Sequence, residues 1–224
     1  MNKTQTQLPT DTWITATWEE YIQIIEDPSY EKAKVYYHNG GLRIEMSPAN
    51  KHSKDHMVIT TIVNLFAMAK KIKVDGRNEC IYRKTGLRVA QPDASYYFRE
   101  NADVVSWEAS IIDLDIYPPP NLVIEVANTS LADDKGEKRL LYEAMNVAEY
   151  WIVDVQKLEV IAFAIANGGS QRINQSQVLP GLAISLLEEA LQRTRQENQL
   201  DIYTWLFSQF QYQEIGRLIS GCLI

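Results

Sequence analysis

Cysteine is nearly absent from this sequence. Cys80 and Cys222 are the only two, they lie far apart, and neither belongs to a metal-ligand spacing. A disulfide framework is therefore excluded, and free thiols in a reducing compartment are expected. Histidine is also scarce, with three residues, and no G-x-S-x-G turn occurs. The sequence consequently gives little support to a Ser/His/Asp hydrolase.

Long apolar runs are missing as well. No segment approaches the roughly 20 consecutive apolar residues that a membrane helix needs. The first residues, MNKTQTQLPTDTW, are polar and lack the apolar centre of a secretory signal. We therefore expect no association with a membrane and a cytoplasmic location.

Positive charge is in deficit. The chain has 22 Lys and Arg against 29 Asp and Glu, a net charge of -7. This balance argues against a protein that coats nucleic acid non-specifically, because phosphate neutralisation by Lys and Arg supplies most of such affinity. It does not exclude a local basic cleft. Basic side chains cluster at 70–77, 83–88 and 135–139, where the ordinary alternative is a solvated face.

What the chain does contain is typical of one globular domain. Of its 224 residues, 46% are hydrophobic and 23% charged, and we find no internal repeat. We predict a single domain over residues 1–224, of a mixed α/β class. Short β-rich runs predict strands at 42–46, 80–98, 122–126, 150–155 and 158–165. Helical spacing and a Thr cap predict helices at 17–26, 53–72, 134–146 and 185–210. The turn sequence His38-Asn39-Gly40-Gly41 predicts a hairpin.

Two acidic residues stand at unusual places in the predicted strands. Glu125 interrupts the apolar run NLVIEV, and a buried carboxylate must be protonated, paired with a cation or bound to a metal. Asp93 follows Pro92 at the start of another strand. If the two converge at one sheet edge, they provide the oxygen ligands that magnesium or manganese prefers. The alternative is that Glu125 pairs with a Lys or Arg and Asp93 caps a turn.

A lysine can join these acids from the next predicted helix. Asp134, Lys138 and Tyr142 are spaced i, i+4, i+8 and line one helix face. In metal-assisted hydrolysis of a phosphodiester, carboxylates hold the metal, and a lysine can orient the attacking water or offset transition-state charge. The alternative for Lys138 is a surface ion pair with Asp134. Tyr142 most simply packs its ring and hydrogen-bonds its hydroxyl within the cleft.

The histidines leave two further possibilities open. His52 and His56 are four residues apart, as in half of a zinc site, but the intervening glutamate and a third ligand are missing. His52 can instead be a polar contact near phosphate at a helix start, or an ordinary structural residue. Glu45, Glu149 and Asp154 are interpreted as structural residues of the hairpin and sheet.

Five motifs in a fixed order are similar to those of a known family. They are MSPANKH (46–52), QPDASYY (91–97), LVIEVANTS (122–130), DKGEKRLLYEAMNVAEYWIVD (134–154) and SQVLPGL (176–182). In this order they resemble the Uma-two family of restriction-endonuclease-like proteins, within the PD-(D/E)XK nuclease superfamily. The resemblance covers roughly residues 14–187, which we expect to be a nuclease-like core, with 188–224 as a C-terminal helical extension. It implies one central mixed sheet containing the predicted strands, flanked by the helices at 53–72 and 134–146.

The resemblance also implies roles for single residues. Asp93 falls on the PD acid, Glu125 on the second acid, and both would bind Mg²⁺ or Mn²⁺. Lys138 and Tyr142 fall on the helical D-x-x-x-K-x-x-x-Y pattern that begins at Asp134, and His52 on the histidine that follows M-S-P. Ala127 stands two residues after Glu125, where the superfamily signature has lysine. Lys138 resembles a migrated replacement that enters the site from the helix.

Two functions from different classes follow. The first is a metal-dependent endonuclease acting on DNA, with Asp93 and Glu125 as metal ligands and Lys138 positioning water. The second is a catalytically inactive nuclease fold that binds nucleic acid or protein, which the net charge and Ala127 favour. The apolar residues of the tail also predict a homodimer interface. They are Leu186, Leu187, Leu191, Leu206, Phe210 and the chain end from 218 to 224.

Overall fold

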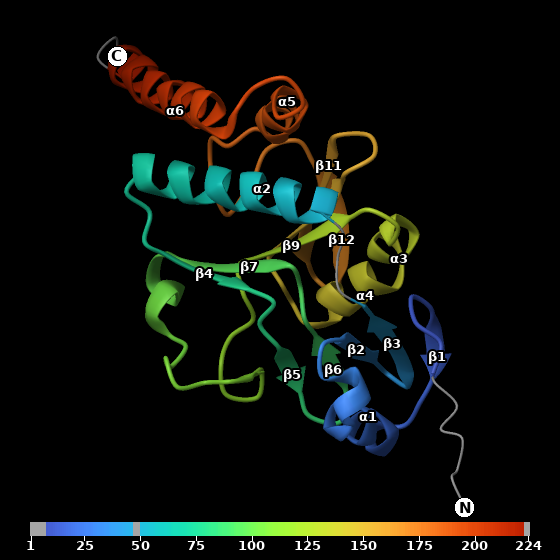
Figure 1. Ribbon diagram of the computed structural model, residues 1–224. Coiled ribbons are helices and arrows are strands. Elements are labelled where there is room, and N and C mark those ends of the chain that lie inside the picture. Colours follow the sequence, from blue (N-terminus) through green and yellow to red (C-terminus); the bar gives the residue numbers. More distant parts are fainter. Residues whose placement is uncertain (1–7, 47–49, 222–224) are drawn as a thin grey trace, which may run out of the picture.

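The computed structural model describes residues 8–46 and 50–221, with side chains described for 8–46 and 52–211. Residues 1–7 of the polar N-terminus, 47–49 of the MSPANKH motif, and 222–224 with Cys222 lie outside the described residues. The described chain forms two six-stranded sheets and a layer of helices (Figure 1). The mixed α/β class predicted from the sequence is confirmed.

The first sheet is built around the predicted hairpin. Its strand order is β1-β3-β2-β6-β5-β8, antiparallel except for the parallel pair β5 and β8. The strands are β1 (Trp13–Thr15), β2 (Lys34–His38), β3 (Gly41–Glu45), β5 (Tyr82–Lys84), β6 (Arg88–Ala90) and β8 (Ile112–Asp113). Asn39 and Gly40 adopt positive φ between β2 and β3, as a tight hairpin turn requires. Helix α1 (Trp18–Glu26) begins at a capping box of Thr17 and Glu20 and packs Tyr21 and Ile24 on this sheet.

The second sheet carries the long apolar strands. Its order is β12-β11-β10-β9-β7-β4, and only β9 and β10 are parallel to each other. The strands are β4 (Val74–Asn78), β7 (Ala94–Phe98), β9 (Leu122–Ala127), β10 (Glu149–Asp154), β11 (Glu159–Ala166) and β12 (Gly169–Ile173). Leu122, Ile124 and Val126 of β9 pack in the core with helix α2 (Asn50–Ala69), whereas Val123 and Ala127 pack with α4 (Glu137–Ala144). Strand β9 is therefore covered on both faces, which explains its continuous apolar run.

A central mixed sheet flanked by helices is present as expected, but the expectation that it contains all the predicted strands is wrong. The predicted strand region 80–98 divides at Gln91-Pro92: β5 and β6 join the hairpin in the first sheet, and β7 joins β9 in the second. The region 42–46 also lies in the first sheet, away from β9, β10 and β11. Proline cannot donate a ladder hydrogen bond, so the chain leaves one sheet there and enters the other.

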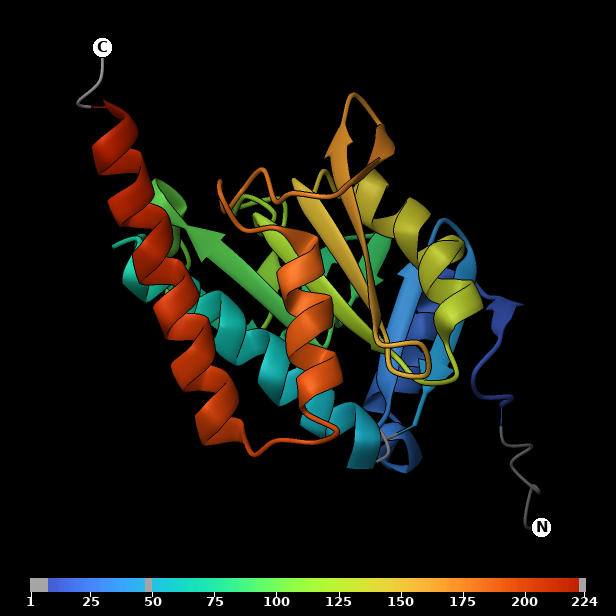
Figure 2. The ribbon, with the colours of Figure 1, turned by 90° about the horizontal axis from the view of Figure 1, so that it is seen from above.

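Three helices cover one face of the second sheet (Figure 2). They are α2 (Asn50–Ala69), α5 (Ile184–Arg193) and α6 (Gln199–Gly221). Helix α2 begins and ends three residues before the predicted 53–72. It stops where Lys71 adopts positive φ. On the other face lie α3 (Leu131–Lys135) and α4 (Glu137–Ala144), and short 3₁₀ helices occur at Pro28–Tyr30 and Arg99–Asp103.

Two predicted helices are each divided in the structure. The segment 134–146 breaks at Gly136, whose φ and ψ of -100° and -107° are not helical, so α3 and α4 are separate. The segment 185–210 breaks between α5 and α6. There the Thr194 hydroxyl donates to the Leu191 carbonyl, and the Asn198 side-chain oxygen accepts from the Asp201 N–H in the first turn of α6. These polar side chains compete with the helical ladder and end it locally.

The apolar residues of the tail face inward. Leu187, Leu191, Leu206 and Phe210 are fully buried between α2, α5, α6 and the second sheet. Phe210 packs edge-on against Phe66, with ring centroids 5.1 Å apart. The dimer interface predicted on these four side chains is therefore wrong, because the chain's own core already covers them. Leu186 is half-buried, and the side chains of 218–224 lie outside the described ones, so at these positions the interface stays a prediction. Dimerisation itself stays a prediction.

No helix among the described residues is both long and apolar enough to cross a bilayer.

Gly76 of β4 packs so closely against its neighbour that we expect no larger residue to fit there without strain. A Cβ at this residue would lie 2.7 Å from a ring carbon of Tyr96, which is buried beneath it. We expect Gly76→Ala to lower the free energy of unfolding by about 1–3 kcal/mol, the usual cost of overpacking. Gly169→Ala is the matched control, since no atom lies within 4 Å of its Cβ position. Equal urea midpoints for the two variants would contradict this packing.

Candidate active site

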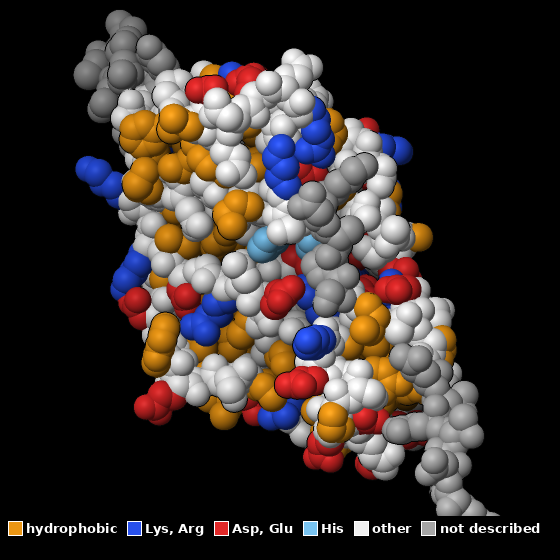
Figure 3. All heavy atoms as spheres, in the orientation of Figure 1, with side chains coloured by type: hydrophobic (Ala, Val, Ile, Leu, Met, Phe, Trp, Pro, Cys, Tyr) orange, Lys and Arg blue, Asp and Glu red, His pale blue; other side chains and the backbone are white. Residues whose placement is uncertain are grey.

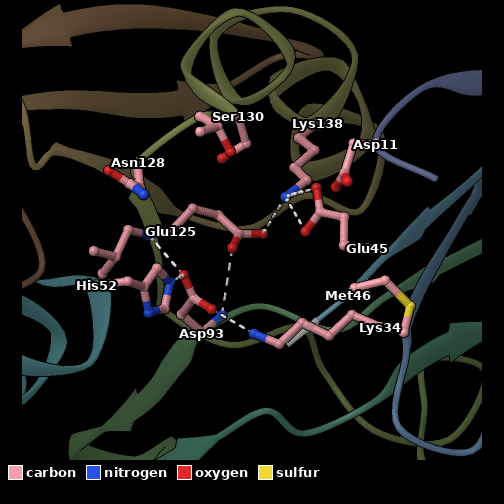
Figure 4. A pocket seen from close by; sticks show the side chains of 12 residues that line it. Asp11, Lys34, Glu45, Met46, His52, Asp93, Glu125, Asn128, Ser130 and Lys138 are labelled. Atoms are coloured by element: carbon pink, nitrogen blue, oxygen red, sulfur yellow. Dashed lines mark hydrogen bonds and ion pairs between the residues drawn. The ribbon is translucent and has the colours of Figure 1, made fainter. Parts of the chain in front are cut away.

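One pocket lies at the junction of the two sheets. It opens on the face seen in Figure 3, where histidine, acidic and basic side chains lie close together between the α2 layer and the first sheet. Its volume is about 320 Å³. Figure 4 shows side chains from both sheets, from α2 and from α4 pointing into it. The residues used below that line it are Lys34, Glu45, His52, Asp93, Glu125 and Lys138.

Asp93 lies at the start of β7, and both of its carboxylate oxygens have donors. Val126 N–H and His52 Nε2–H donate to Oδ2 at 2.7 and 2.9 Å. The Lys34 ammonium donates to Oδ1. Burial alone would raise the pKa of Asp93, but the hydrogen bond from His52 and the charge of Lys34 together hold it below its usual value. Asp93 is therefore a buried, ionised carboxylate.

Glu125 projects from the middle of β9 towards the α3–α4 side. Tyr142 and Tyr36 hydroxyls donate to its Oε1 at 2.7 and 3.2 Å. Its Oε2 accepts only a long bond, 3.4 Å, from the Asp93 backbone N–H. Burial raises the pKa of Glu125 to about 8; the Lys138 ammonium opposes the rise and the neighbouring Asp93 charge adds to it. The two predicted acids thus meet through hydrogen bonds that each makes to the other's strand.

Lys138 stands behind Glu125, and its side chain is 2% exposed. Its Nζ lies 2.9 Å from Glu45 Oε1, 3.1 Å from Asp134 Oδ1 and 3.7 Å from Glu125 Oε1. The ring of Tyr36 lies beneath it, with the centroid 4.2 Å away. Burial alone would lower the pKa of Lys138, but the three carboxylates raise it, so the ammonium stays protonated. Its predicted water-positioning role stays a prediction.

Lys138 and Asp134 do form the ion pair that the sequence allowed, but the pair is buried and not on the surface. Asp134 is fully buried, and the Ser130 hydroxyl donates to its Oδ2 at 2.6 Å. The spacing i, i+4 across the break at Gly136 still places Asp134 beside Lys138. The pair is part of a buried network, where removal of one partner leaves an uncompensated charge.

Sequence reasoning missed three hairpin residues that contact the acids and the lysine of the site. Glu45 was interpreted as structural, yet it links the Lys138 ammonium to Arg43, whose Nε donates to Glu45 Oε1 at 2.6 Å. Tyr36 donates to Glu125, and Lys34 donates to Asp93. Lys34 and Tyr36 are two residues apart on β2, so both point to the same face of the strand. The sequence showed that spacing, but it did not show that this face of β2 contacts Asp93 and Glu125.

The histidines contact Asp93 at different atoms. His52 donates to the Asp93 carboxylate, and His56 Nε2–H donates to its backbone carbonyl at 3.0 Å. Each imidazole therefore already uses its Nε2. No group of three or more His, Cys, Asp or Glu in the described ranges is arranged to hold a metal. The zinc alternative has no third ligand there.

The pair Asp93 and Glu125 fits a hard divalent cation that keeps part of its water shell. Magnesium prefers oxygen ligands and is commonly bound through one or two carboxylates, with water and phosphate completing the shell. Glu125 Oε2 faces the pocket with only one long hydrogen bond, so it has lone pairs to spare. The donor set is therefore suitable, although a cation must share Asp93 with its present partners.

The raised pKa of Glu125 predicts pH-dependent stability in the metal-free protein. Its pKa of about 8 in the fold compares with 4.5 without the fold. Between these values only the folded state holds the proton, so this stabilisation is full below pH 4.5 and is lost as the pH rises through 8. In EDTA, we expect the stability of wild type relative to Glu125→Gln to fall over this range. Urea denaturation at several pH values would contradict this if the difference were constant.

Comparisons with known proteins agree with this architecture. The sequence profile of the Uma2 family, described as "Putative restriction endonuclease", matches residues 18–202. A crystal structure of "a putative nuclease belonging to DUF820" from Anabaena variabilis superposes with a TM-score of 0.52 at 17% sequence identity, covering 85% of this chain and 99% of that chain. At this identity the match shows the fold alone. No curated protein matches the chain.

The family match spans most of the chain and includes Lys34, Glu45, His52, Asp93, Glu125, Lys138 and Tyr142. The family description supports a nuclease, and the structural neighbour supports the fold. The predicted resemblance is confirmed: this chain belongs to the Uma2 family, with a fold of the restriction-endonuclease-like type.

Proposed function

We propose that the protein is a metal-dependent endonuclease that hydrolyses DNA phosphodiester bonds. The observation that carries this proposal is the meeting of Asp93 and Glu125 in one open pocket, each buried on a different strand and bonded to the other's strand. Burying two carboxylates side by side destabilises the folded state. A bound cation would compensate their charge, so the arrangement suits a metal site.

Each residue of the proposed site has a role in the hydrolysis. Asp93 and Glu125 would hold the ion, which would polarise the phosphate and lower the pKa of the attacking water. The water oxygen bonds to phosphorus and gives up a proton to solvent, the bond to the leaving sugar oxygen breaks, and that oxygen takes up a proton from solvent. His52 positions Asp93, and Tyr142 positions Glu125, through the hydrogen bonds described above. Lys138 offsets the negative charge of Glu45, Asp134 and Glu125.

The surface beside the pocket can accept a polyanion locally. Lys and Arg side chains gather near the histidines, over the start of α2 and the end of α5 (Figure 3). Lys54 Nζ donates to the Thr194 carbonyl at 3.0 Å, and Arg195 makes a two-pronged ion pair with Asp55 at 2.7 and 2.8 Å. These contacts fix two cations next to His52. DNA phosphates are their proposed partners, despite the net charge of -7.

Calorimetric titration of manganese, with plasmid cleavage assayed on the same samples, tests the proposal. We expect binding to wild type and manganese-dependent conversion of supercoiled DNA to open forms. Binding without cleavage on duplex, single-stranded and branched DNA would reject the endonuclease. Absence of binding would reject the metal site itself.

A catalytically inactive nuclease fold that binds nucleic acid is the second candidate. Two observations favour it: Ala127 stands where the superfamily signature has lysine, and both oxygens of Asp93 already have donors. Its expected result is DNA binding that is the same with EDTA and with manganese, and no cleavage. A gel-shift titration under both conditions distinguishes it from the endonuclease.

A further inference from the structure

The pocket contains a second lysine, and its place differs from that of Lys138. Lys34 extends from β2 in the first sheet and reaches across the junction to Asp93 of the second. Its side chain is 12% exposed, whereas that of Lys138 is 2% exposed. The Lys34 ammonium has one further partner, Glu79 Oε1 at 3.2 Å, and Glu79 is 53% exposed. Lys34 therefore lies at the mouth of the pocket.

Oδ2 of Asp93 already has two donors, so a cation must bind Oδ1, where it meets the positive Lys34 ammonium. The two positive charges repel each other, so one donor of the carboxylate has to yield. Three groups hold the carboxylate: the Val126 N–H, the His52 ring and the Lys34 ammonium. The first belongs to the backbone of β9 and cannot move without breaking the sheet. The His52 ring stacks on that of His56, with centroids 6.3 Å apart, and His56 is itself bonded to the Asp93 carbonyl. Lys34 has a flexible four-carbon stem and an exposed acceptor beside it, so it yields most easily.

We propose that Lys34 is an exchangeable counter-ion of the site. In the resting state it neutralises Asp93 and competes with the divalent cation. When the cation binds, the Lys34 ammonium moves towards Glu79 and the pocket mouth, where it contacts the phosphate of the substrate. This proposal rests on the metal site of the proposed function, and it assigns the phosphate contact to Lys34 instead of Lys138.

The number of hydrogen-bond donors favours this assignment. An ammonium has three N–H donors. The Lys138 ammonium donates to Glu45 at 3.0 Å and is enclosed by two further carboxylates, Asp134 at 3.1 Å and Glu125 at 3.7 Å. Lys138 could contact phosphate only by leaving one of these charges uncompensated. Lys34 leaves Asp93 when the incoming cation takes over its neutralisation, so its release carries no such penalty.

The effect on metal affinity can be measured directly. If Lys34 must leave before the cation binds, the apparent affinity is reduced by the small fraction of molecules in which it has left. We expect Lys34→Met to bind manganese at least about tenfold more tightly than wild type, since minor states are commonly populated at about 10% or less. Lys34→Arg keeps the charge and is expected to bind about as weakly as wild type. Lys32→Met changes an exposed lysine two residues before Lys34 and is the control without effect.

Two further readouts complete the test. Without metal, Lys34→Met leaves Asp93 short of a cation, so its melting temperature should fall below that of wild type and recover with manganese. At saturating manganese, its cleavage rate should fall because the phosphate contact is lost.

The outcomes separate the two proposals. Tighter manganese binding by Lys34→Met but not by Lys34→Arg supports the exchange. Equal or weaker binding by Lys34→Met, with clear binding by wild type, overturns the role of Lys34 and leaves the metal site intact. No binding by wild type or by either variant overturns the metal site, and the exchange with it.

Discussion

Replacing Glu125 with glutamine is expected to abolish manganese binding and DNA cleavage while the protein stays folded. Glutamine has nearly the same shape and keeps a carbonyl that can accept from the Tyr142 hydroxyl. It removes the charge that a divalent cation needs. Loss of an outer-shell partner alone costs about 10- to 100-fold in metal affinity or activity, so loss of a direct ligand should exceed about 100-fold. Calorimetry and plasmid cleavage on one preparation measure both effects.

The alanine variant and a surface control define the meaning of this result. Glu125→Ala should be equally inactive, but it also leaves two tyrosine hydroxyls without their acceptor. Glu159→Gln makes the same chemical change at an exposed position of β11 and should retain full activity. Cleavage by Glu125→Gln at the wild-type rate would disprove the proposed active site. Lost cleavage with unchanged metal binding would show that residues other than Glu125 bind the ion.

Replacing Lys138 with methionine is expected to destabilise the protein strongly. The change leaves the carboxylates of Glu45 and Asp134 without their shared cation, beside the protonated Glu125. Removing one partner of a buried ion pair typically costs about 3–5 kcal/mol. We expect a loss of this size in the free energy of unfolding, measured by urea denaturation in EDTA at pH 7.

The same helical region offers a matched control for this variant. Lys135 is exposed in α3, and Lys135→Met should change stability by less than about 0.5 kcal/mol. The double variant Lys138→Met with Asp134→Asn removes one of the uncompensated carboxylates and should recover part of the loss. If Lys138→Met were as stable as Lys135→Met, the buried network would not depend on this cation. Lys138 would then be free for a direct role with water.

The chemistry of the site was largely readable from the sequence. Glu125 is conspicuous because a charged residue inside an apolar strand requires a partner. Asp93 is marked by its position after proline at a strand start, and Lys138 by its helical spacing from Asp134. These are local patterns, and they do not depend on which sheet a strand joins. The structure brings all three residues, with His52 and Tyr142, to one pocket or its immediate wall.

The hairpin's contribution to the site could not be read in the same way. Lys34, Tyr36 and Glu45 look like ordinary residues of an exposed β-hairpin, where alternation shows only that some side chains share a face. Which face meets Asp93, Glu125 and Lys138 depends on how the first sheet packs against the second. That contact joins residues far apart in the chain: Tyr36 and Glu125, for example, are 89 positions apart.

The sequence by itself determined the elements and their chemistry: the hairpin turn at Asn39-Gly40, the two-sided burial of β9, and the acids and lysine that it carries or faces. Only the tertiary structure decided that the strands form two sheets, that the leucines of the tail fill the core, and that Lys34 holds Asp93. The reason is physical. Turn chemistry, capping and hydrophobic period act over a few residues, whereas strand pairing and charge neutralisation depend on partners that the chain brings together only when it folds.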